Sequence, residues 1–283
     1  MNPRPLLREA AETLRQAGVP DPEYDSAMLL AEVTGRPPME LRAGFGADVT
    51  EAQEADFRAL LERRREREPL QYILGTVIFR GMEFRTRPGT LIPRPETELL
   101  AAWAEEELCG IEKPEILDLC CGSGCLGLSL AKTVPGAAVT LTDLSPEAVS
   151  LTEENARALG VTCEILRGDL WEPVLGRRFD CVVSNPPYIP TGECDTLQEE
   201  VTREPRMALD GGADGMDFYR RIAAEAKAHL KPGGRLMMEL GFGEAEETAR
   251  LLKAGGAVRT EIRKDDAGID RMILAVYEEE QDV

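Results

Sequence analysis

The sequence predicts an α/β protein in which a small helical domain precedes an open, mostly parallel β-sheet. Short apolar runs typical of buried strands alternate with helical stretches over residues 115–277. Residues 1–72, by contrast, carry apolar side chains at helical spacing. The 283 residues are enough for one large α/β domain and a smaller partner domain.

Composition and charge are those of an acidic globular protein. No apolar run approaches the ~18 residues of a membrane span, and the N-terminus lacks the apolar core of a signal peptide. We therefore expect a cytoplasmic protein with no membrane partner. The formal net charge of −19 argues against broad duplex binding, which depends on Lys and Arg, but it leaves a basic protein partner open.

Seven cysteines and a single histidine limit the metal and acid–base chemistry. Cys120, Cys121 and Cys125 cluster, but there is no CxxC pair, and His229 lies in a stretch with helical character. We therefore expect small buried thiols, no metal site and no histidine general base.

Three helices are predicted within residues 1–72. The first ends at Gly18 and the second at Gly35, while Thr50 and Gln53 form a capping-box signature for the third. That helix ends in the basic stretch Arg63–Arg67. Acidic residues outnumber basic ones over the first 68 residues, so a solvated helix face is favoured over an RNA-binding patch.

The next segment predicts a hairpin and a rigid connection. Short apolar runs broken by glycines at residues 73–90 predict a β-hairpin that links two domains. Pro93 and Pro95 then flank Arg94 before a helix that runs to about Leu108. Two prolines around an arginine, just ahead of the sheet, indicate a rigid segment bordering a site.

A strand, a small-residue turn and a helix open the sheet domain at residues 115–131. Gly122 and Gly124 permit close approach of a ligand to the backbone, and the helix N-terminus supplies N–H donors. The next strand ends in Asp143, about 20 positions on, where a ribose hydroxyl pair would be bound. Because Gly127 completes a G-x-G-x-x-G spacing, NAD binding stays open on spacing alone.

Acidic residues mark the ends of three successive predicted strands, at Asp118, Asp143 and Asp169. Each alone would be an ordinary solvated strand end. Together they suit a nucleoside with a cationic neighbour better than a pyrophosphate, which favours a cofactor other than NAD.

The most informative stretch is Asn185-Pro186-Pro187-Tyr188, which follows a buried strand at residues 181–183. Because prolines cannot continue a strand, the chain leaves the sheet at the carboxyl edge, where ligands bind. The Asn185 side-chain oxygen and the Pro186 carbonyl are two acceptors that could hold both hydrogens of a planar –NH2 group, with Tyr188 stacked on it. Such a site would act by orientation and dipole stabilisation. The alternative interpretation is a structural Asn-Pro turn.

The remaining sequence predicts the elements that complete the sheet. They are a glycine-rich loop at residues 211–215, a helix at 216–230, a tight turn at 231–234, a strand at 235–240, a helix at 244–253, two strands near 258–263 and 271–277, and a frayed acidic tail at 278–283.

In this order and spacing, Asp118–Gly124, Asp143, Asp169 and Asn185–Tyr188 resemble the class I S-adenosylmethionine-dependent methyltransferases of the N-P-P-Y type. With the helical domain, the hairpin and Pro93–Glu98, nearly the whole chain resembles the peptide chain release factor glutamine methyltransferases. These enzymes methylate the side-chain amide of the Gln in a Gly-Gly-Gln loop. N-P-P-Y is shared with adenine and guanine amino-methylating enzymes, so it identifies the chemistry, whereas Pro93–Glu98 and the helical domain discriminate the substrate.

The resemblance implies a Rossmann-like, doubly wound sheet of seven mostly parallel strands with one antiparallel strand. It implies a helical substrate-recognition domain at residues 1–72, a hairpin linker at 73–90 and a catalytic domain at 91–283. We expect the helical domain to grip a folded protein substrate. The implied protein is a cytoplasmic monomer that acts on release factors and holds no stable nucleic acid.

The resemblance also implies the site residues. S-adenosylmethionine would be the cofactor, leaving as S-adenosylhomocysteine, after direct in-line transfer without a metal. Cofactor binding is implied for Cys120, Cys121, Gly122, Ser123, Gly124, Asp143, Asp169, Leu170 and Asn185. Binding of the substrate amide is implied for Asn185, Pro186, Pro187 and Tyr188, with Asn185, Pro186 and Tyr188 catalytic. Cys120 and Cys121 stand where many relatives have Gly and Thr.

Two alternatives stay open. One is a nucleic-acid amino-methyltransferase acting on adenine or guanine, which would use the same N-P-P-Y site but need a basic channel. The other is a non-catalytic assembly protein that binds S-adenosylmethionine, against which the intact Asn185 and Tyr188 argue.

Overall fold

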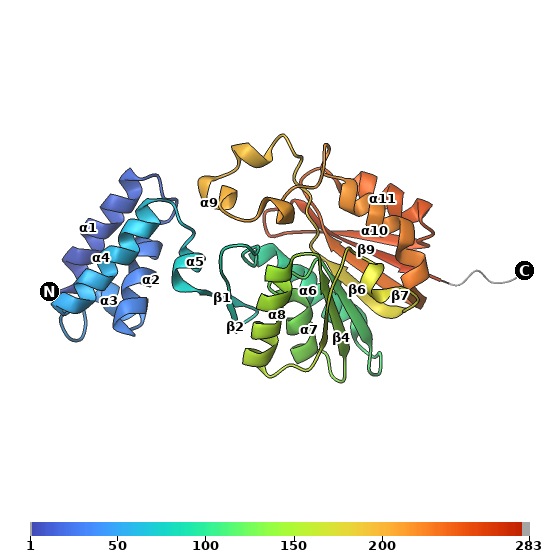
Figure 1. The fold of residues 1–283 in the computed structure, drawn as a ribbon, viewed down its shortest axis with the longest axis horizontal. Coiled ribbons are helices and arrows are strands. Elements are labelled where there is room, and N and C mark those ends of the chain that lie inside the picture. The colour runs from blue at the N-terminus through green and yellow to red at the C-terminus, as the bar shows by residue number, and fades with distance from the viewer. Residues whose placement is uncertain (1, 279–283) are drawn as a thin grey trace, which may run out of the picture. The chain divides into compact units, whose positions relative to one another are not determined.

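The computed structural model describes residues 2–278, which form two compact units (Figure 1). The helical unit comprises the described residues of Met1–Thr76 together with Gln198–Arg203. The sheet unit comprises the described residues of Val77–Leu197 and Glu204–Val283. The helical unit is therefore discontinuous in sequence, because a short segment from the second half of the chain packs with it.

The helical unit is built from short helices around an apolar core. Its helices are α1 (Pro3–Gln16), α2 (Pro22–Thr34), α3 (Pro38–Ala43), α4 (Glu51–Arg65), α5 (Leu70–Leu74) and α9 (Glu199–Thr202). The capping box of Thr50 and Gln53 is confirmed, and Gly35 ends α2 in the left-handed conformation. Leu14, Leu30 and Phe57 are completely buried in the core between the helices. The short helices α3 and α5 were not predicted.

The basic end of α4 differs from the prediction of a solvated face. Arg64 is buried, and its Nε donates to Asp25 Oδ2 at 2.7 Å while its Nη2 donates to Glu200 Oε1 at 2.6 Å. Arg67 donates to both carboxylate oxygens of Glu200. Burial alone would raise the pKa of Glu200, but the hydrogen bonds from Arg67 and Arg64 lower it to about 2. The prediction was wrong for Arg64, which binds carboxylates inside the unit.

The sheet unit contains the predicted doubly wound sheet. Its strand order is β5-β4-β3-β6-β7-β9-β8, and β9 runs antiparallel to both of its neighbours, β7 and β8, while the other pairs are parallel. The strands are β3 (Glu115–Leu119), β4 (Ala138–Asp143), β5 (Glu164–Arg167), β6 (Phe179–Ser184), β7 (Leu230–Glu239), β8 (Arg259–Lys264) and β9 (Asp270–Tyr277). The predicted hairpin forms a separate two-stranded sheet of β1 (Thr76–Phe79) and β2 (Met82–Arg85).

Helices cover both faces of the sheet (Figure 1). They are α6 (Pro95–Leu108), α7 (Cys125–Thr133) and α8 (Pro146–Leu159) on one face, and α10 (Asp217–Glu225) and α11 (Ala245–Ala254) on the other. Successive strand residues point to opposite faces, so Met237 packs in the first layer while Leu236 and Met238 pack in the second. Strand order reverses between β3 and β6, which places a ligand crevice at their carboxyl ends.

Two predicted boundaries near β7 were wrong. Helix α10 ends at Glu225 and continues as a 3-10 turn, so the predicted helix to residue 230 is too long. The predicted turn at 231–234 lies within β7, where the pairing with β6 shifts register between Phe179 and Cys181. Residues 279–283 of the predicted acidic tail lie outside the described residues. Within residues 2–278, the helices are too short or too polar to cross a membrane.

Candidate active site

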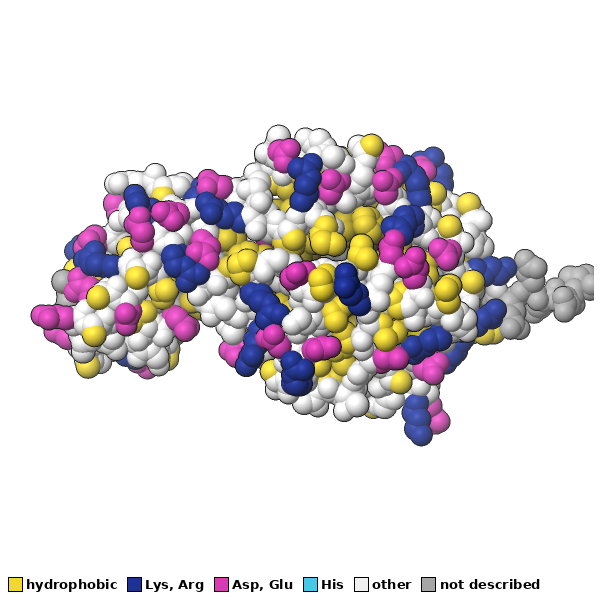
Figure 2. Space-filling view, in the orientation of Figure 1, with side chains coloured by type: hydrophobic (Ala, Val, Ile, Leu, Met, Phe, Trp, Pro, Cys, Tyr) yellow, Lys and Arg dark blue, Asp and Glu magenta, His cyan; other side chains and the backbone are white. Residues whose placement is uncertain are grey.

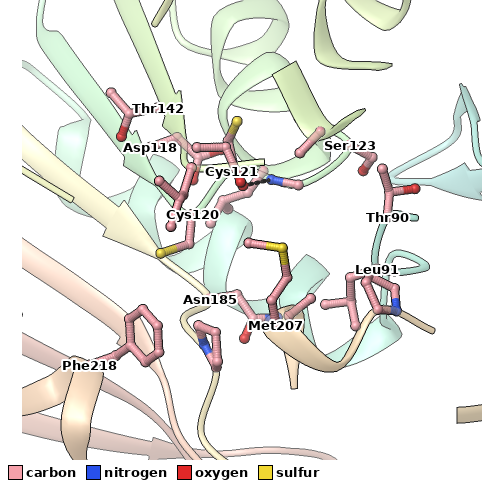
Figure 3. A pocket seen from close by; sticks show the side chains of 18 of the residues that line it. Thr90, Leu91, Asp118, Cys120, Cys121, Ser123, Thr142, Asn185, Met207 and Phe218 are labelled. Carbon is pink, nitrogen blue, oxygen red and sulfur yellow. Dashed lines mark hydrogen bonds between the residues drawn. The ribbon is translucent and has the colours of Figure 1, made fainter. Parts of the chain in front are cut away.

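A cavity of about 1060 Å³, counting the space at its mouth, opens at the carboxyl ends of β3, β4 and β6. It is lined by Cys120, Asn185 and Phe218, among others, and Figure 3 shows these side chains around the opening. Of the predicted site residues, the lining contains Cys120, Cys121, Gly122, Ser123, Asp143, Asp169, Leu170, Asn185 and Pro187. The lining does not include Gly124, Pro186 and Tyr188, which are sequence neighbours of lining residues.

The loop after β3 is held in a conformation that ordinary residues avoid. Cys120 has φ +59° although it is not a glycine, and Leu170, which also lines the cavity, has φ +47°. Backbone outliers of this kind concentrate at ligand sites, because the surrounding fold must hold them in place. Gly122 has φ +57°, and a side chain there would meet no neighbouring atom. The loop therefore leaves its backbone open toward the cavity.

The three glycines of the predicted fingerprint have different structural causes. Gly124, with φ +79°, precedes α7, and a Cβ there would lie 2.8 Å from the Thr152 side chain. A Cβ on Gly127 would lie 2.9 Å from Asp118, whose Oδ2 accepts a hydrogen bond from Gly127 N at 2.8 Å. Gly127 is thus required by helix–strand packing, and the G-x-G-x-x-G match carries no information about NAD.

The three strand-end acids are not equivalent. Asp118 lies within β3, and burial raises its pKa to about 8. Asp143 is at the end of β4 and accepts hydrogen bonds from Gly122 N and Ser145 N, both at 2.9 Å. Asp118 also lines the cavity, but it is 1% exposed and its Oδ2 accepts from Gly127 N. Asp143 and Asp169 are less buried, and a ligand carrying hydroxyl or amino groups could reach their carboxylates more readily.

Asp169 has a cationic partner that the sequence pattern did not predict. Arg221 of α10 reaches Asp169 Oδ2 at 2.6 Å, and both residues line the cavity. The Arg221 guanidinium also lies 5.8 Å from the centre of the Phe218 ring. Phe218 and Met207 supply apolar wall around the cavity (Figure 3). This edge combines a carboxylate with apolar and aromatic surface, which suits a purine ring.

The Asn185 amide is fixed by a neighbouring hydroxyl. Strand β6 ends at Ser184, and Asn185 Nδ2 donates to Thr97 Oγ1 at 3.1 Å. Thr97 Oγ1 in turn donates to Glu239 Oε2 at 2.6 Å. Within residues 2–278, Asn185 Oδ1 takes part in no hydrogen bond, so this acceptor is available at the cavity.

Tyr188 is turned toward a buried carboxyl. Its hydroxyl lies 3.4 Å from Glu239 Oε1, and its ring belongs to the apolar layer that contains Met238. Burial raises the pKa of Glu239 to about 7. Each carboxylate oxygen of Glu239 thus contacts a different residue near Asn185. Oε2 contacts Thr97 and Oε1 contacts Tyr188.

Glu204 binds the segment around Arg94 through a hydrogen bond and an ion pair. Glu204 is buried, and its Oε2 accepts from Ile92 N at 2.9 Å while Oε1 pairs with Arg94. Arg94 lines the cavity, as do Thr97 and Pro205, whereas Glu98 does not. Thr97 falls within the predicted Pro93–Glu98 segment but was given no role of its own. Glu204, Arg221 and Glu239 were not singled out from the sequence, because no local motif connects them to Asn185.

The face shown in Figure 2 mixes acidic and basic side chains. Apolar side chains gather over the middle of the sheet unit on this face, and charges of both signs are interspersed around them. This surface offers no continuous basic stripe along which a nucleic-acid backbone could lie.

Comparisons with known proteins match both parts of the chain to methyltransferases. A PrmC N-terminal domain model matches residues 5–75, and a methyltransferase small domain model matches residues 95–214. A release factor glutamine methyltransferase of Geobacter sulfurreducens is 42% identical over 92% of this chain and 91% of its own length. One of Deinococcus radiodurans is 41% identical over 97% and 98%, respectively.

A solved structure supports the fold. The 16S rRNA N2 G1207 methyltransferase RsmC of T. thermophilus, in complex with AdoMet and guanosine, superposes with a TM-score of 0.54. It is 23% identical over 72% of this chain and 50% of its own chain. The predicted class I methyltransferase fold is thereby confirmed.

Proposed function

The chain belongs to the release factor glutamine methyltransferases, and on this premise we propose its substrate and mechanism. The protein transfers the methyl group of S-adenosylmethionine to the side-chain amide nitrogen (N5) of the Gln in the Gly-Gly-Gln loop of class-1 peptide chain release factors. The observation that carries this proposal is the Asn185 amide at the cavity, with its nitrogen bound by Thr97 and its oxygen available.

The cavity fits the proposed cofactor. The open backbone at Gly122 and the strained Cys120 would hold the methionine portion, Asp143 the ribose hydroxyls, and Asp169 with Leu170 the adenine. When bound, S-adenosylmethionine supplies an electrophilic methyl group on its sulfonium, and S-adenosylhomocysteine is the product.

Catalysis on this proposal is a matter of positioning. An amide nitrogen is a poor nucleophile, because its lone pair is delocalised into the carbonyl. Asn185 Oδ1 and the Pro186 carbonyl would accept its two hydrogens and hold it in line with the methyl group, while the Tyr188 ring packs against the amide. Formation of the N–CH3 bond would be matched by cleavage of the S–CH3 bond, and the amide nitrogen would release one proton to solvent. The fixed acceptors stabilise the positive charge that develops on the nitrogen.

The partner and the location follow from the same premise. We propose that a release factor is the transient protein partner, that the helical unit contacts its folded body, and that the enzyme works as a cytoplasmic monomer without stably bound nucleic acid.

A labelling experiment tests the function against the nucleic-acid alternative. The purified protein is incubated with methyl-labelled S-adenosylmethionine and a recombinant release factor, either wild type or with its loop Gln changed to Ala. Label on the wild-type factor alone is expected, and mass spectrometry of the loop peptide should locate one added methyl group on the Gln. Label on neither factor, but on added RNA or DNA, would assign the protein to the nucleic-acid branch.

A further inference from the structure

We propose that Thr97 and Glu239 are positioning residues that set which end of the Asn185 amide faces the substrate. The inference rests on the proposed function and deepens it, because it concerns how the substrate –NH2 group is recognised. Neither residue needs to touch substrate or cofactor in this role. Both would act through Asn185.

Three elements that are distant in sequence meet at this point. Thr97 lies in the first turn of α6, Asn185 directly follows β6, and Glu239 is the last residue of β7. The distances are 3.1 Å from Asn185 Nδ2 to Thr97 Oγ1 and 2.6 Å from Thr97 Oγ1 to Glu239 Oε2. Thr97 is 3% exposed and Glu239 is 1% exposed, so water does not compete for these contacts.

The number of available protons fixes the donor and the acceptor in each hydrogen bond of the series Asn185–Thr97–Glu239. A threonine hydroxyl has one proton to donate, and an ionised carboxylate can only accept. When Glu239 is ionised, the Thr97 proton is therefore committed to Glu239, and the remaining Thr97 lone pairs can only accept. The Asn185 atom facing Thr97 must then be the –NH2 donor, which turns Oδ1 toward the cavity. The Asn185 side-chain amide, which could otherwise adopt either of two flipped orientations, is thus held in one of them.

The orientation decides what the site can bind. With Oδ1 at the cavity, Asn185 offers an acceptor to the hydrogens of the substrate –NH2 group. With the amide reversed, Asn185 would offer a second pair of N–H donors to a group that is itself a donor, and no hydrogen bond would form. A buried carboxyl is costly to the fold, so its position behind Asn185 fits a role in setting this orientation.

The supporting groups also limit movement of Glu239. Tyr188 contacts Glu239 Oε1 at 3.4 Å, and the Tyr219 hydroxyl donates to the Glu239 backbone carbonyl at 3.0 Å. Tyr219 is completely buried in the layer beneath. The carboxylate is therefore held on a rigid strand end, as precise positioning of Asn185 requires.

The test uses three substitutions in the full-length protein. Thr97→Val removes the hydroxyl but keeps the shape, and Thr97→Ser keeps the hydroxyl. Thr248→Val is the matched control, because Thr248 of α11 is buried and its hydroxyl has no hydrogen-bond partner within the described residues. For each variant, kcat and KM are measured with a release factor, and the Kd for S-adenosylmethionine is measured separately.

Thr97→Val should lower kcat/KM for the release factor by about 100-fold, the scale expected for misplacing a reacting group. Its Kd for S-adenosylmethionine should stay close to that of the wild type. Thr97→Ser should recover most of the lost activity, and Thr248→Val should match the wild type. Wild-type turnover by Thr97→Val would overturn the inference, and so would equal losses in the Val and Ser variants, which would indicate a packing role.

The outcomes separate this inference from the function on which it rests. A wild-type protein that fails to label the release factor overturns the proposed function and the inference together. A wild-type protein that labels it, alongside an equally active Thr97→Val variant, overturns the inference alone.

Discussion

The Asp143 carboxylate accepts a hydrogen bond from Gly122 N at 2.9 Å, which ties the end of β4 to the loop that follows β3. Its other oxygen accepts from Ser145 N at the start of α8. These contacts hold the carboxylate at the cavity, although burial raises its pKa. Asp143 is therefore pre-positioned to accept from hydroxyl groups of a ligand.

Asp143→Ala should weaken S-adenosylmethionine binding by about 10- to 100-fold, the equivalent of one or two lost charge-assisted hydrogen bonds. Isothermal titration calorimetry would measure the change. Asp266→Ala, which removes an exposed carboxylate from the loop between β8 and β9, is the control and should leave the Kd unchanged. Equal affinity of the Asp143→Ala variant and the wild type would exclude Asp143 from the cofactor site.

Asn185→Ala should lose methyl transfer while keeping cofactor affinity within a few-fold. We expect a fall in kcat of about 100- to 1000-fold, as when one pre-organised dipole is removed from a reacting group. Single-turnover transfer from labelled S-adenosylmethionine to a release factor would measure it. Normal turnover in this variant would remove Asn185 from the mechanism.

The pH dependence of turnover should report the ionisation of Glu239. Burial raises its pKa to about 7, opposed by Thr97 and Arg271 and assisted by Glu96, with Tyr188 also facing it. Because the ionised form commits the Thr97 proton, kcat should rise as pH increases through about 7. The effect on stability has the opposite sign. With a pKa raised above 4.5, Glu239 stabilises the fold most at low pH, and this contribution is lost as pH rises through about 7.

The Glu239→Gln variant would show whether the rise of kcat near pH 7 comes from Glu239 or from another carboxyl group. Burial also raises the pKa of Asp118 to about 8 and that of Glu244 to about 7, so several carboxyls ionise in the same range. A glutamine at 239 can still accept from Thr97 but does not titrate, so the limb near pH 7 should disappear in the variant. An unchanged pH profile would mean that another group controls turnover.

Arg64→Ala should destabilise the helical unit by about 3–5 kcal/mol, because it removes the cation that Asp25 binds in the buried interior, while Glu200 keeps Arg67. Thermal unfolding followed by circular dichroism would detect the loss. Arg65→Ala is the matched control on the same helix, since Arg65 and its partner Glu62 are about half exposed, with side-chain exposures of 50% and 53%. Similar unfolding of the two variants would contradict a special role for the buried pair.

Removing residues 1–72 should raise the KM for an intact release factor far more than the KM for a short peptide containing the Gly-Gly-Gln loop. The physical reason is that a peptide needs only the cavity, whereas a folded substrate would also bind the helical unit. An unchanged Kd for S-adenosylmethionine would verify that the sheet unit stays folded. Equal effects on both substrates would refute the recognition role.

Local patterns account for what the sequence predicted. Apolar runs gave the strands and their order of appearance, and the Thr50 capping box gave the start of α4, because such signals act over a few residues. The carboxyl edge of β6 followed from the prolines after Asn185. These features required no knowledge of distant contacts.

Long-range contacts explain what was missed. Thr97 and Glu239 are 142 residues apart. Thr97 lay in the predicted Pro93–Glu98 segment, but nothing local linked it to a glutamate at the end of a strand. Arg64 looked like one solvated arginine among several, because its partner Glu200 lies 136 residues away. Gly127 matched a dinucleotide fingerprint for a packing reason, since the same spacing serves any close helix–strand contact.

The attachment of Gln198–Arg203 to the helical unit bears on how the chain is made. Synthesis proceeds from the N-terminus, so α1 to α5 leave the ribosome long before Glu200 is added. Until then Arg64 has Asp25 but lacks its second carboxylate, and the charge network of this unit is incomplete. The helical unit thus reaches its final structure only after most of the sheet unit has been translated. A gene fragment ending at residue 76 would encode this unit without its segment Gln198–Arg203.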